Sequence, residues 1–117
     1  MPSLILLILR SQNLEALLDF YTSLLAISFE EHTDHGPQHY GAQVGEVYLE
    51  LYPTKQEQRP LDGLGFSVSN LEAALANIDQ KYIRRQGEDT PFGKRATLTD
   101  PDGRFLYVKE MSQEPEK

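Results

Sequence analysis

The residues in this chain that could do chemistry begin with three histidines, His32, His35 and His39, which fall within eight residues around Gly36-Pro37. Imidazole nitrogens are common ligands of zinc and other transition metals, so this spacing could hold a metal ion. The Gly-Pro turn separates the three rings, however, and no neighbouring acceptor is evident that would orient them. We therefore interpret the segment as a solvated loop, from which His39 could still reach a site on the sheet.

A second group of polar side chains is Asp100-Pro101-Asp102-Gly103. Two aspartates at this spacing are found in calcium loops, but no glutamate follows at the distance that such a loop requires. Proline is favoured at the second position of a tight turn and glycine at the last. The composition therefore predicts a turn between two strands, with no metal.

Bulk composition excludes several other kinds of chemistry. The chain has 117 residues, a formal net charge of −7 and no cysteine, so thiol nucleophiles, disulfides and thiolate metal sites are absent. No serine has the sequence context of a nucleophile elbow, and no glycine-rich phosphate loop occurs. The negative charge would repel a phosphate backbone, which argues against nucleic-acid binding. The apolar run from Leu4 to Leu9 is too short for a membrane span or a signal peptide, so we expect a cytoplasmic protein.

The chain contains an internal repeat. Asn13-Leu14-Glu15-Ala16 recurs 57 residues later as Asn70-Leu71-Glu72-Ala73. Each copy opens an amphipathic pattern, with asparagine as a suitable N-cap and glutamate near the positive end of the helix dipole. The same shift places the apolar stripe of the first predicted helix on that of the second: Leu14, Leu17, Leu18, Tyr21 and Leu25 correspond to Leu71, Ala74, Leu75, Ile78 and Tyr82.

Each predicted helix is preceded by one apolar strand and followed by three shorter strands. The expected strands are Leu4 to Arg10, Ile27 to Thr33, His39 to Val44 and Val47 to Tyr52 in the first half, and Leu64 to Ser69, Arg84 to Glu88, Arg95 to Thr99 and Arg104 to Glu110 in the second. We expect a single domain over residues 1–117, with one module at about 3–53, another at about 62–111 and a frayed tail at 112–117.

Three segments carry a family resemblance: residues 11–15 entering a helix that continues to Phe20-Tyr21, residues 68–72 in the second copy, and residues 100–103 before the last strand. On these the chain resembles the vicinal-oxygen-chelate superfamily, which contains glyoxalase I, extradiol dioxygenases, methylmalonyl-CoA epimerase and the bleomycin-resistance proteins. The resemblance implies an α+β fold in which two βαβββ modules in tandem form a curved half-barrel cup, usually completed in a homodimer. Phe20 and Tyr21 are expected to be core residues without a chemical role.

Metal-using members of the family place four ligands in the cup, and the resemblance implies Leu6, Glu50, Gly63 and Tyr107 for these positions. The shift of 57 residues maps the first pair onto the second, which supports the assignment. Leucine and glycine side chains offer no donor atom, and a neutral tyrosine is a poor ligand. We therefore expect no metal cofactor and interpret Glu50 as a polar anchor, with a divalent ion held through Glu50 as the alternative.

Strand alternation predicts which side chains face the cup. On the strand from Val47 to Tyr52 the aliphatic residues would pack on the helices, while their neighbours face the cup. Applied to the other strands, the rule adds Leu4, Leu6, Ile8, Gly65 and Ser67. The predicted ligand-binding residues are Arg10, Tyr48, Glu50, Tyr52, Phe105, Tyr107 and Lys109. The strand from Arg95 to Thr99 is left unassigned, because a bulge beside the turn could invert its alternation.

Three functions follow from these residues. The first is a metal-independent protein that binds a small molecule, similar to the bleomycin-resistance branch, because apolar walls with few polar groups are typical of small-molecule sites. The second is a metal-dependent lyase, isomerase or dioxygenase with relocated ligands such as Glu50, Tyr107 and His39. The third is a structural or regulatory dimer without a ligand, whose cup would be filled by Tyr48 and Tyr107.

Overall fold

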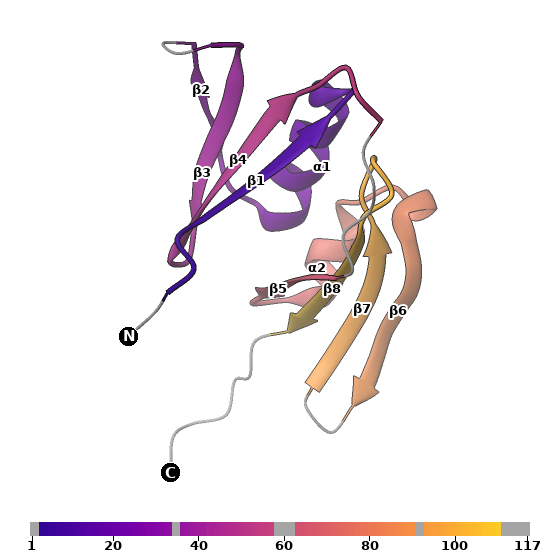
Figure 1. The fold of residues 1–117 in the computed structure, drawn as a ribbon. Helices are drawn as coiled ribbons and strands as arrows, with labels where there is room; N and C mark the ends of the chain where they lie inside the picture. Colours follow the sequence, from indigo (N-terminus) through magenta and orange to yellow (C-terminus); the bar gives the residue numbers. More distant parts are fainter. Residues whose placement is uncertain (1–2, 34–35, 58–62, 91–92, 111–117) are drawn as a thin grey trace.

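The computed structural model describes residues 3–33, 36–57, 63–90 and 93–110. These residues form two four-stranded sheets, each with one helix packed on one face (Figure 1). The first module comprises β1 (Leu6–Ser11), α1 (Leu14–Leu25), β2 (Glu30–His32), β3 (His39–Val44) and β4 (Val47–Pro53). The second comprises β5 (Leu64–Val68), α2 (Leu71–Ala76), a short 3₁₀ helix η1 (Gln80–Tyr82), β6 (Ile83–Thr90), β7 (Gly93–Thr99) and β8 (Phe105–Glu110). The predicted tail at 112–117 and His35 lie outside the described residues.

The two modules have the same topology, which confirms the predicted tandem of βαβββ units. Their strand orders are β1-β4-β3-β2 and β5-β8-β7-β6, with a parallel pair at one edge of each sheet. Leu7 pairs with Leu49 in the first sheet, and Leu64 pairs with Leu106 in the second. The repeat shift read from the sequence therefore holds for the strand register as well as for the helix starts.

Both helices begin where the repeat predicts. The Asn13 side chain accepts a hydrogen bond from the Ala16 amide at 3.2 Å, and the Asn70 side chain accepts one from the Ala73 amide at 2.9 Å. The predicted lengths are less accurate, because α2 ends at Ala76 and the chain turns at Asn77. The last two residues of the predicted stripe, Ile78 and Tyr82, therefore lie beyond the helix.

The buried face of α1 also differs from the predicted stripe. Leu14, Leu18 and Leu25 are only half-buried, whereas the fully buried side chains are Leu17, Phe20, Tyr21 and Leu24. The physical reason is that α1 packs against two partners, its own sheet and the second module, so the centre of the buried face is displaced. The Phe20 ring meets the Tyr82 ring edge-on at 5.0 Å between centroids.

Several strand boundaries differ from the predicted ones. The strand expected at Ile27 to Thr33 is shortened to β2, because the chain leaves α1 through Ala26 in the left-handed conformation and pairs with β3 only from Glu30. Leu4 precedes β1 and is 66% exposed. Arg104 precedes β8 and is buried.

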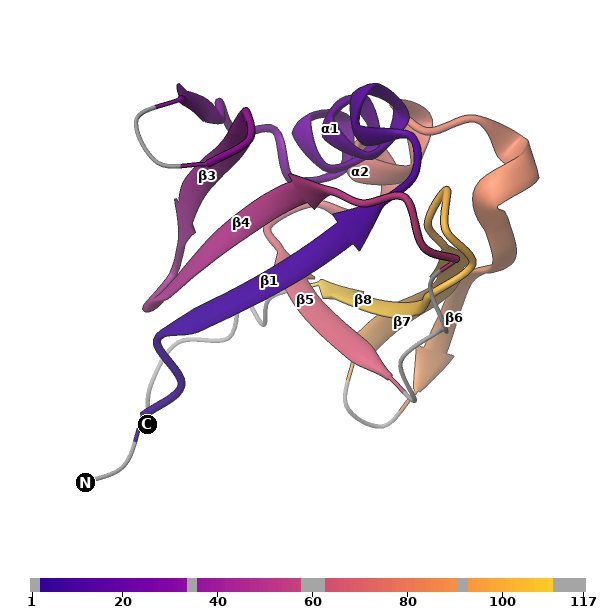
Figure 2. The same cartoon turned by 45° about the horizontal axis from the view of Figure 1, so that its top comes forward.

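One hydrophobic core joins the two modules. It contains buried leucines of both sheets together with the apolar faces of α1 and α2, which lie side by side (Figure 2). Burying a leucine side chain contributes about 1.5–3 kcal/mol, so this shared core fixes the modules relative to each other. The opposite face of each sheet carries no helix and remains open. Neither helix in the described part of the chain is long and apolar enough to cross a membrane.

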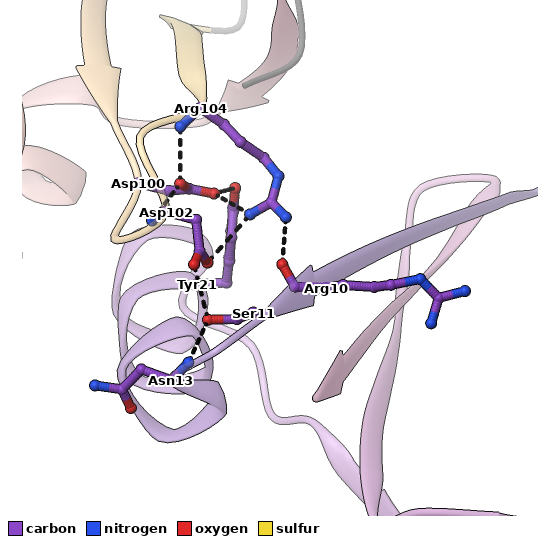
Figure 3. A network of polar contacts seen from close by, with 7 residues as sticks. All are labelled: Arg10, Ser11, Asn13, Tyr21, Asp100, Asp102 and Arg104. Atoms are coloured by element: carbon purple, nitrogen blue, oxygen red, sulfur yellow. Dashed lines mark hydrogen bonds and ion pairs between the residues drawn. The ribbon is translucent and has the colours of Figure 1, made fainter. Parts of the chain in front are cut away.

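A buried polar network also connects the modules (Figure 3). The Arg104 guanidinium lies 2.9 Å from the Asp100 carboxylate and donates a hydrogen bond to the Arg10 carbonyl at the end of β1. The Tyr21 hydroxyl of α1 donates to the same carboxylate at 2.8 Å. Ser11 donates to Asp102 at 3.0 Å and accepts from the Asn13 amide. Each buried charge is therefore paired and hydrogen-bonded, which burial requires.

The turn predicted at Asp100 to Gly103 is confirmed. The Gly103 amide donates to the Asp100 carbonyl at 2.9 Å, and the glycine has a φ of +86°. Phe20 and Tyr21 are core residues as predicted, and the Tyr21 hydroxyl in addition anchors this turn to α1. Burial, and then the Asp100 carboxylate, raise the pKa of Tyr21 well above its ordinary value, so the phenol stays protonated as a donor.

The network predicts that Tyr21→Phe destabilises the folded protein. Loss of the donor to a buried carboxylate should lower the free energy of unfolding by about 1–3 kcal/mol. Tyr82→Phe is the matched control, because no hydrogen bond of the described residues uses the Tyr82 hydroxyl. Since the folded-state pKa of Tyr21 is raised, its contribution should be constant below about pH 10 and decline above it. Urea unfolding at several pH values measures this, and equal stability of the wild type and Tyr21→Phe would contradict the account.

Candidate functional site

The open face of the first sheet carries the side chains that alternation predicts. On β4, Leu49 and Leu51 are buried in the core, whereas Tyr48, Glu50 and Tyr52 are half-buried on the other face. Ile8 pairs with Glu50 and Arg10 pairs with Tyr52 across β1 and β4, so their side chains share that face. The alternation therefore follows the prediction, while ligand binding by these residues stays a prediction.

A row of stacked side chains crosses this face. The His39 ring lies parallel to the Tyr52 ring, with 4.1 Å between centroids and 8° between planes. The Arg10 guanidinium lies over the same tyrosine ring, 5.5 Å from its centroid. His32 pairs with His39 across β2 and β3, with their ring centroids 5.4 Å apart. The row takes one side chain from each of the four strands, with only His39 and Tyr52 parallel and His32 tilted by 35° against His39.

Beside this row, the Tyr48 ring lies across Gly41 of β3. A methyl group at Gly41 would stand 2.6 Å and 2.7 Å from carbons of that ring, so only glycine leaves room for it. The Tyr48 hydroxyl lies 3.0 Å from Nε2 of His32. Desolvation raises the pKa of Tyr48, and the carboxylates of Glu30 and Glu50 raise it further.

The interpretation of the histidines as a solvated loop is wrong for two of them. His32 lies on β2 and is half-buried, and His39 lies on β3 and is buried. The signal for His39 was present in the sequence, because the two-residue turn Gly45-Glu46 closes a hairpin that places His39 on the face of Glu50. His32 and Glu30 fall inside the strand predicted at Ile27 to Thr33, but the sequence does not assign them a face, because that depends on the register of β2 against β3.

The open face of the second sheet carries the other predicted residues. Phe105 is 45% exposed and Tyr107 is 39% exposed, although both are large aromatic side chains. Lys109 is exposed on the same face of β8. The unassigned strand β7 stays in register with β8, and the irregularities lie in its pairing with β6. Arg95 therefore joins this face, with its guanidinium 5.7 Å from the Tyr107 ring centroid.

The two halves of the predicted site thus lie on separate sheets within one chain. No strand pair among the described residues joins the sheets. Three cavities, of about 240, 340 and 320 Å³, are each lined by residues of both modules. The seven predicted ligand-binding residues line none of these three. The faces can form one enclosed site only if another surface covers them.

The four positions implied for metal ligands do not fit a metal ion. Leu6 and Gly63 supply no donor, and a methyl group at Gly63 would lie 3.2 Å from the ring of Tyr107, which fills that space. Glu50 lies on the other sheet from Tyr107. In the described part of the chain, no group of three or more histidine, aspartate or glutamate residues could hold a metal ion.

Comparison with protein families gives one match. Residues 4–106 match the model described as the Glyoxalase/Bleomycin resistance protein/Dioxygenase superfamily. Comparison with curated proteins gives no significant match.

Solved structures with the same fold include proteins of different kinds. Oxidase ChaP-H1 is 17% identical with a TM-score of 0.77, covering 98% of this chain and 100% of its own. Hypothetical protein SA1046 from S. aureus is 15% identical with a TM-score of 0.72, covering 95% of each chain. TnmS3, an antibiotic binding protein from Streptomyces sp. CB03234, is 22% identical with a TM-score of 0.68, covering 96% and 98%. At these identities the likeness shows the fold.

The contact between Tyr48 and Gly41 predicts the effect of Gly41→Ala. The added methyl group should push the phenol off the strand, separate it from His32 and bring the Tyr48 pKa back toward its ordinary value. An NMR titration of ring-labelled tyrosine measures this. Gly65→Ala is the control, because its methyl group would make only an ordinary contact, 3.7 Å from a backbone oxygen. An unchanged Tyr48 titration in Gly41→Ala would contradict the described packing.

Proposed function

The chain belongs to the glyoxalase/bleomycin resistance protein/dioxygenase superfamily, and from that premise we propose that it binds a small, partly aromatic molecule without a metal ion. The observation that carries the proposal is the pair of open faces, where Tyr48 and Tyr52 flank a carboxylate and Phe105 and Tyr107 are exposed. Aromatic walls with a few polar groups are typical of small-molecule sites. The fold shared with an antibiotic binding protein supports this function.

Metal independence is supported by the chemistry of the four inferred ligand positions, two of which offer no donor atom. The rival function is a metal-dependent lyase, isomerase or dioxygenase that uses relocated ligands. One contact favours it: His39 Nε2 lies 3.9 Å from an oxygen of Glu50. Its third ligand, Tyr107, would have to come from the other sheet or from a second copy of the chain.

We also propose that a homodimer completes the site. The β1 edge and its approach expose Leu4, Ile5, Leu6 and Ile8 by 38–69%, an apolar surface that a second copy would cover. The open face of the first sheet carries two carboxylates, Glu30 and Glu50, and one cation, Arg10, whereas that of the second carries Arg95 and Lys109. These opposite charges favour the first sheet of one copy facing the second sheet of the other.

The ligand proposal predicts that Glu50→Ala impairs binding and leaves folding nearly unchanged, because the Glu50 side chain is on the open face outside the core. The matched control is Glu31→Ala. Glu31 is an exposed residue of β2 that pairs with Tyr40, and both lie on the face of the sheet opposite to Glu50. A thermal-shift screen of metabolites and antibiotics against EDTA-treated protein, followed by calorimetry on each hit, measures both. A library without hits, or hits that bind Glu50→Ala and Glu31→Ala equally well, would contradict the proposal.

Metal content separates the proposal from its rival. We expect the purified protein to hold no stoichiometric zinc, nickel, iron or manganese, and chelators to leave its melting temperature unchanged, because a lone carboxylate binds such ions weakly. Elemental analysis is the measurement. About one metal ion per chain, lost in Glu50→Gln and in His39→Ala, would favour the metal-dependent enzyme.

The dimer is tested by sedimentation at micromolar concentrations. We expect a dimer for the wild type and a shift toward monomer for Ile8→Glu, which adds a charge to the exposed apolar surface of β1. Ser28→Glu, at an exposed position outside that surface, is the control. A wild-type monomer under these conditions would overturn the homodimer.

A further inference from the structure

His39 has one nitrogen bound to the protein and one that is not. Its Nδ1 lies 3.0 Å from the Pro37 carbonyl oxygen. A carbonyl can only accept a hydrogen bond, so Nδ1 carries the proton and donates it. In the neutral imidazole, Nε2 is then a hydrogen-bond acceptor, held in place by the contact of Nδ1 and by the stacked Tyr52 ring.

The group that this nitrogen faces is also an acceptor. Nε2 lies 3.9 Å from Oε2 of Glu50, which is beyond hydrogen-bond distance. Among the described residues, no hydrogen bond reaches either atom. The two side chains are only 8% and 18% exposed, so their acceptors are largely withdrawn from solvent. Two desolvated acceptors at this separation are suited to a donor placed between them.

The neighbouring side chains favour a positively charged donor. Glu30 and Glu50 both pair with Gly41, from opposite sides of β3, so a second carboxylate stands on the same face. The Tyr48 ring lies beside them, and aromatic faces attract cations. Arg10 is engaged with the Tyr52 ring from the neighbouring strand β1. An anionic group here would meet two carboxylates, whereas an ammonium group would meet two acceptors and the Tyr48 ring.

We infer that the ligand of the first sheet carries a protonated amine, which sits between the Glu50 carboxylate and His39 Nε2 and donates a hydrogen bond to each. This inference rests on the proposed small-molecule function and adds the chemical class of the ligand. His39 is therefore a binding residue, with Tyr52 and the Pro37 carbonyl as the groups that position it.

Three indole probes that differ only in their terminal group test the inference: tryptamine, tryptophol and indole-3-propionate. Calorimetry or NMR titration of the EDTA-treated full chain should show tryptamine binding about tenfold tighter than tryptophol, with indole-3-propionate weakest. Glu50→Gln removes the charge, and His39→Phe keeps a ring against Tyr52 but removes the acceptor. Each should abolish the advantage of tryptamine, while Glu31→Gln on the opposite face should retain it.

Any of three results with the indole probes would overturn the inference: equal or tighter binding of indole-3-propionate, a tryptamine advantage that survives both Glu50→Gln and His39→Phe, or binding of none of the probes. Zinc binding that both variants abolish, with no tryptamine binding, would also overturn it, because the bridging cation would then be a metal. The proposed function is judged separately by the ligand library. A library that gives acidic or neutral hits sensitive to Glu50→Ala would sustain that function while rejecting the amine.

Discussion

The arrangement of the molecule depends on the buried ion pair between Asp100 and Arg104. The pair lies in the β7–β8 turn of the second module, yet its hydrogen bonds reach Tyr21 on α1 and the carbonyl of Arg10 at the end of β1. The charges stay paired within the turn itself, but moving the turn away would leave the buried Tyr21 hydroxyl and the Arg10 carbonyl without their partners, at a cost of about 1–3 kcal/mol each, so this turn favours one position against the first module. Among the described residues the corresponding β3–β4 turn has no such pair, and a cavity of about 340 Å³ lies beside its Gly45. The two modules therefore have the same strand topology but differ in how their hairpin turns contact the other module.

The modules pack together through their helix-covered faces, and this packing has a consequence for function. The core uses the helix-covered faces of both sheets, so the other two faces, with their tyrosines and charged groups, stay open. On the first sheet, strand pairing places Glu50 beside His39 and opposite Gly41, whose missing side chain makes room for Tyr48. The chemistry of the site thus follows from the register of one hairpin. A shift of one residue would move every one of these side chains into the core.

Much of the fold could be predicted from the sequence, because its signals are local. The asparagine caps, the repeat spacing and the strand alternation each depend on a few neighbouring residues. Features that depend on distant contacts were not predictable in this way. One is the hydrogen bond from the Arg104 guanidinium to the Arg10 carbonyl, two residues far apart in the sequence. Another is the displaced buried face of α1, which results from its contact with the second module. For the site, the face of Glu50 followed from alternation, whereas the position of His32 depended on where β2 begins to pair.

The central claim is that a small molecule binds on the open faces without a metal ion. Chemical-shift mapping tests it most directly: backbone amides of the EDTA-treated protein are followed by NMR while the tightest-binding library compound is added. The account predicts saturable shifts at β4 and β3 around Glu50 and His39, and at β8 around Tyr107, with the helices unaffected. Shifts confined to the cavity between α1 and residues 77–82, lined by Phe20 and Ile78, or shifts that appear only after a divalent metal is added, would contradict it.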